Sequence, residues 1–266
     1  MVMPIADDNS DRRIVPFVNY FLIAINVWVF LFFQRIGENQ EFTYAWSTVP
    51  LEIVTGKDVV TPPRTVIDKE TGKRVEIPGL QPTPGSVYFT LITSMFMHGS
   101  IMHILGNMLF LWIFGDNVED YLGHGRYLAF YLVCGVIASL CHVFTTVLIF
   151  GADSPEAKVP SLGASGAISG VLGGYVLLFP YRRVTVIMFR MLTTVPAWVA
   201  VGMWFAMQLL FSLSMFGGRG GDGVAYAAHI GGFLAGLALI NVFGAGLEQP
   251  GPVTAPPEPY NRNEPW

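Results

Sequence analysis

This chain has few charged residues. Asp, Glu, Lys and Arg make up 13% of its 266 residues and hydrophobic residues make up 52%, whereas about a quarter of a soluble domain is charged. The shortage excludes an ordinary soluble domain and, with so many apolar residues, also a disordered chain. The net charge of −4 and the scatter of the 15 basic residues argue against nucleic acid as a partner. We therefore expect an integral membrane protein.

Cysteine is almost absent as well. The two cysteines, Cys134 and Cys141, lie seven residues apart on one predicted helix. That spacing means a rise of about 10.5 Å, more than the roughly 7 Å between Cα atoms that a disulfide allows. Both are expected to be packing residues. No internal repeat is present, which weighs against an inverted-repeat transporter, and no cofactor is predicted.

Long apolar runs are what the chain has instead. A helix needs about 20 residues to cross a bilayer, and six runs predict an all-α membrane protein built as a bundle of six transmembrane helices. The predicted spans are Ile14–Phe33, Ile101–Phe114, Tyr127–Phe150, Ala164–Phe179, Pro196–Phe216 and Tyr226–Leu247. The second span continues as a helix through the charged segment GDNVEDYLG.

Basic residues near the span ends predict the orientation, because short basic flanks stay on the cytoplasmic side. With the N-terminus inside, the inner segments hold Arg12, Arg13, Arg126, Arg182, Arg183, Arg190 and Arg262, whereas the short outer loops hold Lys158 and Arg219. The expected location is a bacterial inner (plasma) membrane, with both termini in the cytoplasm. No cleavable signal peptide is predicted, since no small-residue cleavage site follows the first apolar run.

The chain is expected to divide into three parts. Residues 1–13 form a cytoplasmic segment, residues 14–247 the membrane domain and residues 248–266 a Pro-rich disordered tail. Residues 34–100 of the membrane domain form a long outer loop. Its segment TVIDKETGKRVEI predicts an exposed hairpin, and SVYFTLITSMFMHG predicts a helix at the membrane interface, with Ser100 as the N-cap of the second span.

Polar side chains at membrane depth are costly, and they mark sites. The informative ones are His98, His103 and Asn107 at the start of the second span, Ser165 at the start of the fourth and His229 near the start of the sixth. These three spans run in the same direction through the membrane. All five residues are therefore expected in one layer, in the outer half of the bilayer.

Small residues indicate which spans approach closely. Stripes at four-residue spacing lie on the fourth span (Gly166, Gly170 and Gly174) and on the sixth (Ala228, Gly232 and Gly236). If the stripes face each other, Ser165 and His229 meet at the seam as a nucleophile and a base. Ser165 also begins a helix, where free N–H groups favour negative charge. His103 and Asn107 share a helix face, from which both can donate to an oxyanion.

Less specific interpretations stay open for such residues. A membrane serine commonly bonds its own helix backbone, and this is the interpretation for Ser169. An intramembrane histidine often only bonds a neighbouring helix, as we expect for His142. A metal site at His98, His103 and His229 is a further alternative. The chain has no HExxH motif and no intramembrane carboxylate near them, so no metal is predicted.

Three segments carry a resemblance to a known family. MHGSIMHILGNMLFLWIFGDNVED, GASGAISGVLGGY and AAHIGGFLAG occur on alternate spans, in the order found in the rhomboid intramembrane serine proteases. The chain resembles that family from about Ile14 to Leu247, which implies a rhomboid-like six-helix bundle. The resemblance also implies that Ser165 is the nucleophile and His229 the general base, without a carboxylate. It implies that His103 and Asn107 stabilise the oxyanion and that His98 is structural.

Two positions depart from the pattern of the best-known bacterial members. Those proteins stack an aromatic residue on the catalytic histidine one turn after the nucleophile, where this chain has Ser169. Their first loop contains a Trp-Arg pair, whereas Trp46 is followed here by Ser47.

The activity that the resemblance implies is cleavage of transmembrane or membrane-proximal segments of membrane proteins within the lipid bilayer, by a Ser-His dyad. One alternative is a non-catalytic rhomboid-like protein that binds client membrane proteins. Such proteins usually lack the Ser or the His, and this chain has both. A small transporter or channel is a third hypothesis, but the spans carry no chain of carboxylates.

Overall fold

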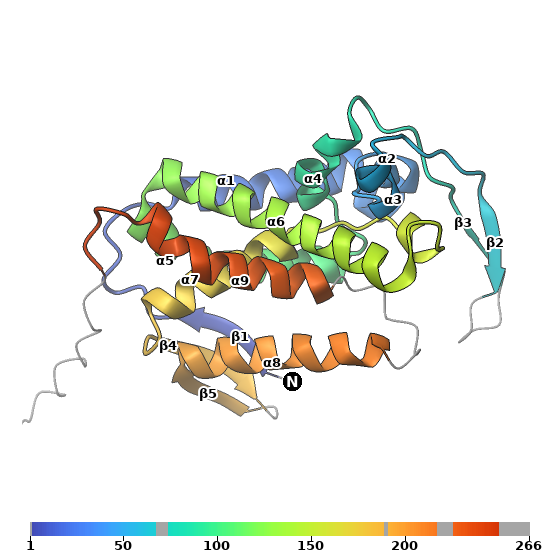
Figure 1. The fold of residues 1–266 in the computed structure, drawn as a ribbon. Helices are drawn as coiled ribbons and strands as arrows, with labels where there is room; N and C mark the ends of the chain where they lie inside the picture. Colours follow the sequence, from blue (N-terminus) through green and yellow to red (C-terminus); the bar gives the residue numbers. More distant parts are fainter. Residues whose placement is uncertain (1, 68–73, 189–190, 217–225, 250–266) are drawn as a thin grey trace, which may run out of the picture.

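A computed structural model describes residues 2–67, 74–188, 191–216 and 226–249 (Figure 1). These ranges contain nine α-helices, several short 3-10 and π segments and five strands. From residue 250 on, the predicted Pro-rich tail lies outside the described residues.

Six helices coincide with the predicted spans. They are α1 (Phe17–Trp28, continued by η1, Val29–Phe33), α5 (Ile101–Leu122), α6 (His124–Phe150), α7 (Ser165–Leu178), α8 (Ala197–Phe216) and α9 (Tyr226–Phe243). Within the described residues, α5, α6 and α9 are long and apolar enough to cross a membrane. The 14 residues of α7 give a length of about 21 Å at 1.5 Å per residue, short of a bilayer core. Over the part of the chain that the structure describes, the protein is mainly helical with three candidate spans, and the predicted number of six is not confirmed.

Helix α7 is central to the bundle and contacts α5, α6 and α9 (Figure 1). The two small-residue stripes face each other. A Cβ atom added to Gly232 would lie 2.1 Å from the carbonyl oxygen of Gly166, and one added to Gly236 would lie 2.0 Å from that of Gly170. Real Cβ atoms essentially never come within 3.0 Å of another heavy atom. Glycine is therefore needed at both positions of α9 for the helices to approach this closely.

Helix α6 packs against both α7 and α9 along the line where the two helices meet. Cys134 and Cys141 are both free, as the spacing predicts. A Cβ atom added to Gly170 would lie 2.4 Å from the Cβ of Cys134, and one added to Gly231 would lie 2.5 Å from the Cβ of Cys141. The cysteines thus act as small apolar packing residues.

A three-stranded antiparallel sheet departs from the predicted all-α fold. Strand β1 (Val2–Asp7) pairs with β4 (Arg183–Met188), which pairs with β5 (Met191–Pro196). The sheet lies beside α8 in Figure 1. Strands β4 and β5 are short and rich in Val, Ile and Thr, which favour strands, and β4 buries Val184 and Val186. The apolar periodicity predicts only a connection between two spans here.

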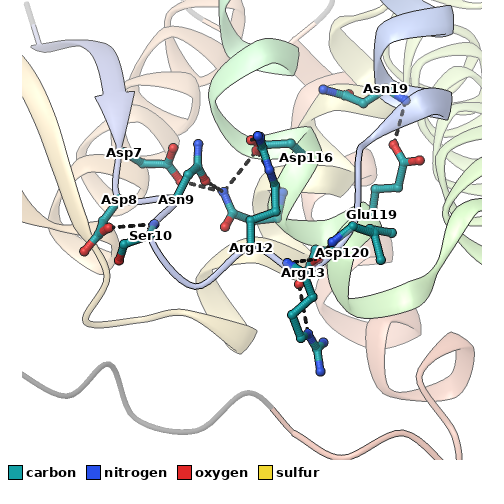
Figure 2. Close-up of polar contacts among 12 residues, drawn as sticks. Asp7, Asp8, Asn9, Ser10, Arg12, Arg13, Asn19, Asp116, Glu119 and Asp120 are labelled. Atoms are coloured by element: carbon teal, nitrogen blue, oxygen red, sulfur yellow. Dashed lines mark hydrogen bonds and ion pairs between the residues drawn. The ribbon is translucent and has the colours of Figure 1, made fainter.

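Carboxylates at the end of α5 hold the chain that leads into α1 (Figure 2). Asp120 accepts hydrogen bonds from the backbone N–H groups of Arg13 and Ile14, both at 2.8 Å. Glu119 accepts from those of Val18 and Asn19, at 2.9 and 2.7 Å. The first N–H groups of a helix have no partner within it, so Glu119 caps α1 from a distant part of the sequence.

A second polar cluster ties the N-terminal segment to the bundle. The buried guanidinium group of Arg182 pairs with Asp11 at 2.6 Å, and the hydroxyl of Tyr175 donates to Asp7 at 2.8 Å. Burial and the nearby carboxyl group of Asp116 raise the pKa of Asp7 to about 7. Residues 2–13 are thus part of the folded structure.

The long loop before α5 folds into short elements. They are η2 (Arg35–Gly37), α2 (Gln40–Ala45), α3 (Pro50–Thr55), β2 (Arg64–Ile67), β3 (Arg74–Ile77), η3 (Val87–Phe89), α4 (Thr90–Thr93) and η4 (Ser94–Phe96). Strands β2 and β3 pair antiparallel, as predicted, and η3, α4 and η4 form the helical run before α5. The Oγ of Ser100 accepts from the N–H of His103 at 3.1 Å, so Ser100 is the predicted N-cap.

Candidate active site

Ser165 is the first residue of α7. The chain turns into this helix at Gly163, whose φ of +119° favours glycine. The N–H of Gly163 donates to the carbonyl oxygen of Ser94 at 2.8 Å, which anchors the turn to η4. One helical turn later, the hydroxyl of Ser169 donates to the carbonyl oxygen of Ser165 at 2.6 Å. Ser169 therefore bonds the backbone of its own helix, as predicted for it from the sequence.

His229 lies near the start of α9, opposite Ser165. Its Nε2 is 2.7 Å from the Oγ of Ser165, within hydrogen-bond distance. Gly166 directly follows Ser165, and Gly232 lies within one turn of His229. The close packing of these two glycines allows the contact. Both side chains are partly exposed. A serine hydroxyl bonded to an imidazole nitrogen is the arrangement in which a base can take up the proton of a nucleophile.

The other ring nitrogen of His229 contacts a residue that sequence reasoning did not identify. Its Nδ1 is 2.9 Å from Oε1 of Gln208, on α8. The rings of Trp204 and Tyr226 lie beside the imidazole, with centroids 6.0 and 6.4 Å away. Gln208 stands in the apolar sequence MWFAMQLLF, and a strongly polar side chain in a predicted span is the signal that singles it out.

His103 and Asn107 lie on one face of α5, against the turn that precedes Ser165. A Cβ atom added to Gly163 would be 2.8 Å from Nε2 of His103 and 3.7 Å from Nδ2 of Asn107. The N–H of Gly99 donates to Nδ1 of His103 at 3.4 Å, so a neutral His103 carries its proton on Nε2, toward the turn. Among the described residues, the buried Nδ2 of Asn107 has no hydrogen-bond partner. Two donors thus lie near Ser165.

His98 packs against His103. Its buried ring packs edge-on against that of His103, with centroids 5.1 Å apart. The side chain of Gln34 accepts from the N–H of His98 and donates to its carbonyl oxygen, both at 2.9 Å. Gln34 is a second residue that sequence reasoning missed, and it too is a polar residue at the end of a predicted span.

A small pocket adjoins Ser165. It is lined by Ser94, Ser139, Ser161, Gly163, Ser165 and Gly166, among others, and its volume is about 20 Å³. A cavity holds a water molecule when that volume exceeds about 10–15 Å³ and polar partners are present. The pocket is therefore large enough for a water molecule beside the serine.

Comparison with known proteins gives consistent matches. The rhomboid domain matches residues 85–245. The chain is 34% identical over 154 residues to Rhomboid protein 1, mitochondrial, of Saccharomyces cerevisiae, covering 56% of this chain and 40% of that protein. It is 31% identical over 148 residues to the human Presenilin-associated rhomboid-like protein, mitochondrial, covering 55% and 36%. It is 38% identical over 93 residues to Rhomboid protease GluP of Bacillus subtilis, covering 34% and 16%.

These matches bear on the length of the relatives that the chain covers and on the expected membrane. The chain spans two fifths or less of the length of each of these three relatives. The expected location in a bacterial plasma membrane, with cytoplasmic termini, is contradicted, because the yeast and human relatives are mitochondrial proteins by name. The distribution of Lys and Arg orients helices in a membrane, but it does not identify the membrane.

Proposed function

The chain belongs to the rhomboid family, and from this premise we propose that it is an intramembrane serine protease. The observation that carries the proposal is the 2.7 Å contact between Oγ of Ser165 and Nε2 of His229. The printed name of one relative, Rhomboid protease GluP, supports the same activity. In this proposal Ser165 and His229 form a catalytic dyad.

The dyad acts in two steps. Oγ of Ser165 attacks the scissile carbonyl carbon while Nε2 of His229 takes the hydroxyl proton. The C–N bond then breaks, and the protonated His229 gives that proton to the leaving amine. A water molecule, for which the pocket beside Ser165 has room, then loses a proton to His229 and hydrolyses the ester. The ester bond to Oγ breaks, Oγ takes the proton back from His229, and the free enzyme is restored.

The oxyanion that forms during each attack needs hydrogen-bond donors. Nε2–H of His103 and Nδ2–H of Asn107 approach the turn before Ser165, and the backbone N–H of Ser165 is one of the free donors at the start of α7. Asn107 supports this role most directly, because its buried amide donor has no partner among the described residues. An oxyanion supplies the missing acceptor.

The substrate class follows from where the dyad lies. Ser165 lies at the start of α7 and His229 in the first turn of α9, both apolar helices, so the substrates are the ends of transmembrane segments of other proteins, presented within the lipid bilayer. A peptide bond inside a helix is shielded by its hydrogen bonds. The preferred cleavage sites therefore contain small or helix-breaking residues, at which a helix end unwinds.

Proteolysis in reconstituted vesicles tests the proposal. The purified protein and a transmembrane substrate are combined in proteoliposomes, and fragments are identified by mass spectrometry. We expect cleavage by the wild type, no cleavage by Ser165→Ala or His229→Ala, and near-normal cleavage by the matched control Ser169→Ala. Cleavage that survives Ser165→Ala refutes the proposed nucleophile. Binding of the substrate without cleavage by the wild type favours the non-catalytic client-binding alternative.

A further inference from the structure

We propose that Gln208 is a positioning residue for His229, and this inference rests on the proposed protease function. Oε1 of Gln208 lies 2.9 Å from Nδ1 of His229, on the side of the ring opposite the bond to Ser165. Gln208 comes from α8, whereas the dyad comes from α7 and α9. A third helix therefore orients the base, through an amide where serine proteases of other folds use a carboxylate.

The hydrogen-bond chemistry of the ring gives Gln208 a definite role. Nε2 accepts the proton of Ser165 only if the single proton of the neutral imidazole is on Nδ1. A proton on Nδ1 needs an acceptor, which the amide oxygen of Gln208 provides. If the amide group were turned round, its NH₂ would donate to Nδ1, the ring proton would move to Nε2, and Nε2 could not act as the base.

Neighbouring aromatic contacts hold Gln208 at this distance. The ring of Phe205 on α8 stacks on that of Phe233 on α9, with centroids 4.3 Å apart. Trp204, one turn before Gln208, packs both on His229 and on Phe110 of α5, with centroids 6.0 and 6.2 Å away. These contacts seat the face of α8 that carries Gln208 against α5 and α9.

Other groups around His229 do not take over this role. Ser169 bonds the carbonyl oxygen of Ser165. The titratable side chains that interact electrostatically with His229 are His103 from α5 and His142 from α6. Helices α7 and α8 face His229 with uncharged groups, including Ser165, Trp204 and Gln208. Among the residues that the structure describes, no carboxylate interacts with His229, so a charge placed at position 208 acts on the imidazole without competition from them.

Two substitutions of similar size separate positioning from packing. Gln208→Met keeps the length of the side chain but lacks the amide acceptor, and Gln208→Glu keeps an acceptor oxygen and adds a charge. Leu210→Met, at an exposed position of the same helix, is the matched control. Each variant is assayed as the full chain in proteoliposomes for kcat, KM, the pH profile of kcat and thermal unfolding, beside the wild type and Ser165→Ala.

We expect Gln208→Met to lower kcat about tenfold with little change in KM, because one hydrogen bond that orients the base is lost. The acid limb of its pH profile moves to lower pH, since the protonated imidazole loses its acceptor. Gln208→Glu should recover kcat to within about threefold of the wild type and move the acid limb to higher pH, since a carboxylate stabilises the imidazolium. Leu210→Met should match the wild type.

Two results overturn the inference and leave the protease function intact. One is wild-type kcat and an unmoved acid limb in Gln208→Met. The other is an equal loss in Gln208→Met and Gln208→Glu, with lower unfolding temperatures and unmoved acid limbs, which is the signature of packing alone. If the wild-type activity persists in Ser165→Ala, the proposed function itself fails and the inference fails with it.

Discussion

Replacement of Gly232 by alanine probes the helix contact on which the dyad depends. The added Cβ atom would lie 2.1 Å from the carbonyl oxygen of Gly166, where atoms do not approach within 3.0 Å. Helices α7 and α9 must then separate locally by about 0.9 Å, the shortfall from an allowed contact. If the same shift separates Ser165 from His229, their 2.7 Å contact lengthens to about 3.6 Å, which is no longer a hydrogen bond.

A misplacement of about 1 Å costs on the order of 10²-fold in rate, or about 2.7 kcal/mol of transition-state stabilisation. We expect Gly232→Ala to lower kcat by this factor in the proteoliposome assay. Overpacking also costs about 1–3 kcal/mol of stability, so thermal unfolding is measured on the same samples to show that the variant is folded.

Gly202 offers a matched control on α8. A Cβ atom added there meets nothing within 4 Å, so Gly202→Ala should keep normal activity. A folded Gly232→Ala that cleaves at the wild-type rate would refute the reasoning, because the close approach of the helices would then not control the dyad.

Three further outcomes follow from other parts of the structure. Asn107→Ala should lower kcat by about 10²–10³-fold without lowering the unfolding temperature, because its buried amide donor has no partner among the described residues to lose; an unchanged kcat would contradict its proposed role. Gln34→Leu should lower the unfolding temperature, since the N–H and carbonyl groups of His98 lose their partners at about 1–3 kcal/mol each; wild-type stability would contradict this. The pKa of Asp7 is raised from 3.8 to about 7, so the folded state favours its protonated form, and this contribution to stability is fully present at acid pH and is lost as the pH rises toward 7. Asp7→Asn should therefore flatten the fall in unfolding temperature between about pH 4 and pH 7, the range between the two pKa values, and an unchanged slope would count against the shift.

Much of the candidate site could be predicted from local patterns. The small-residue stripes predict which helices meet, because close backbone approach in a membrane needs residues without bulky side chains. Ser165 and His229 each adjoin a stripe, and the structure has them in contact. Ser100 could be identified as an N-cap from its position before an apolar run.

Other features depend on contacts between distant segments. The pairing of Val2–Asp7 with Arg183–Met188 joins the N-terminus to a connection that carries no span-length pattern. Gln208 is visible as a polar residue, but α8 is apolar on all sides, so its sequence does not give the rotation of the helix about its axis. The packing of Phe205 on Phe233 and of Trp204 on Phe110 turns Gln208 toward His229.

A fluorophosphonate reports most directly whether Ser165 is an activated nucleophile. It forms a covalent adduct with a serine hydroxyl that an adjacent base deprotonates, and peptide mass spectrometry of the labelled protein locates the adduct. We expect one adduct on Ser165, its loss in His229→Ala and its slower formation in Gln208→Met. Absence of an adduct on Ser165 in the folded wild type, or equal labelling without His229, would contradict the account.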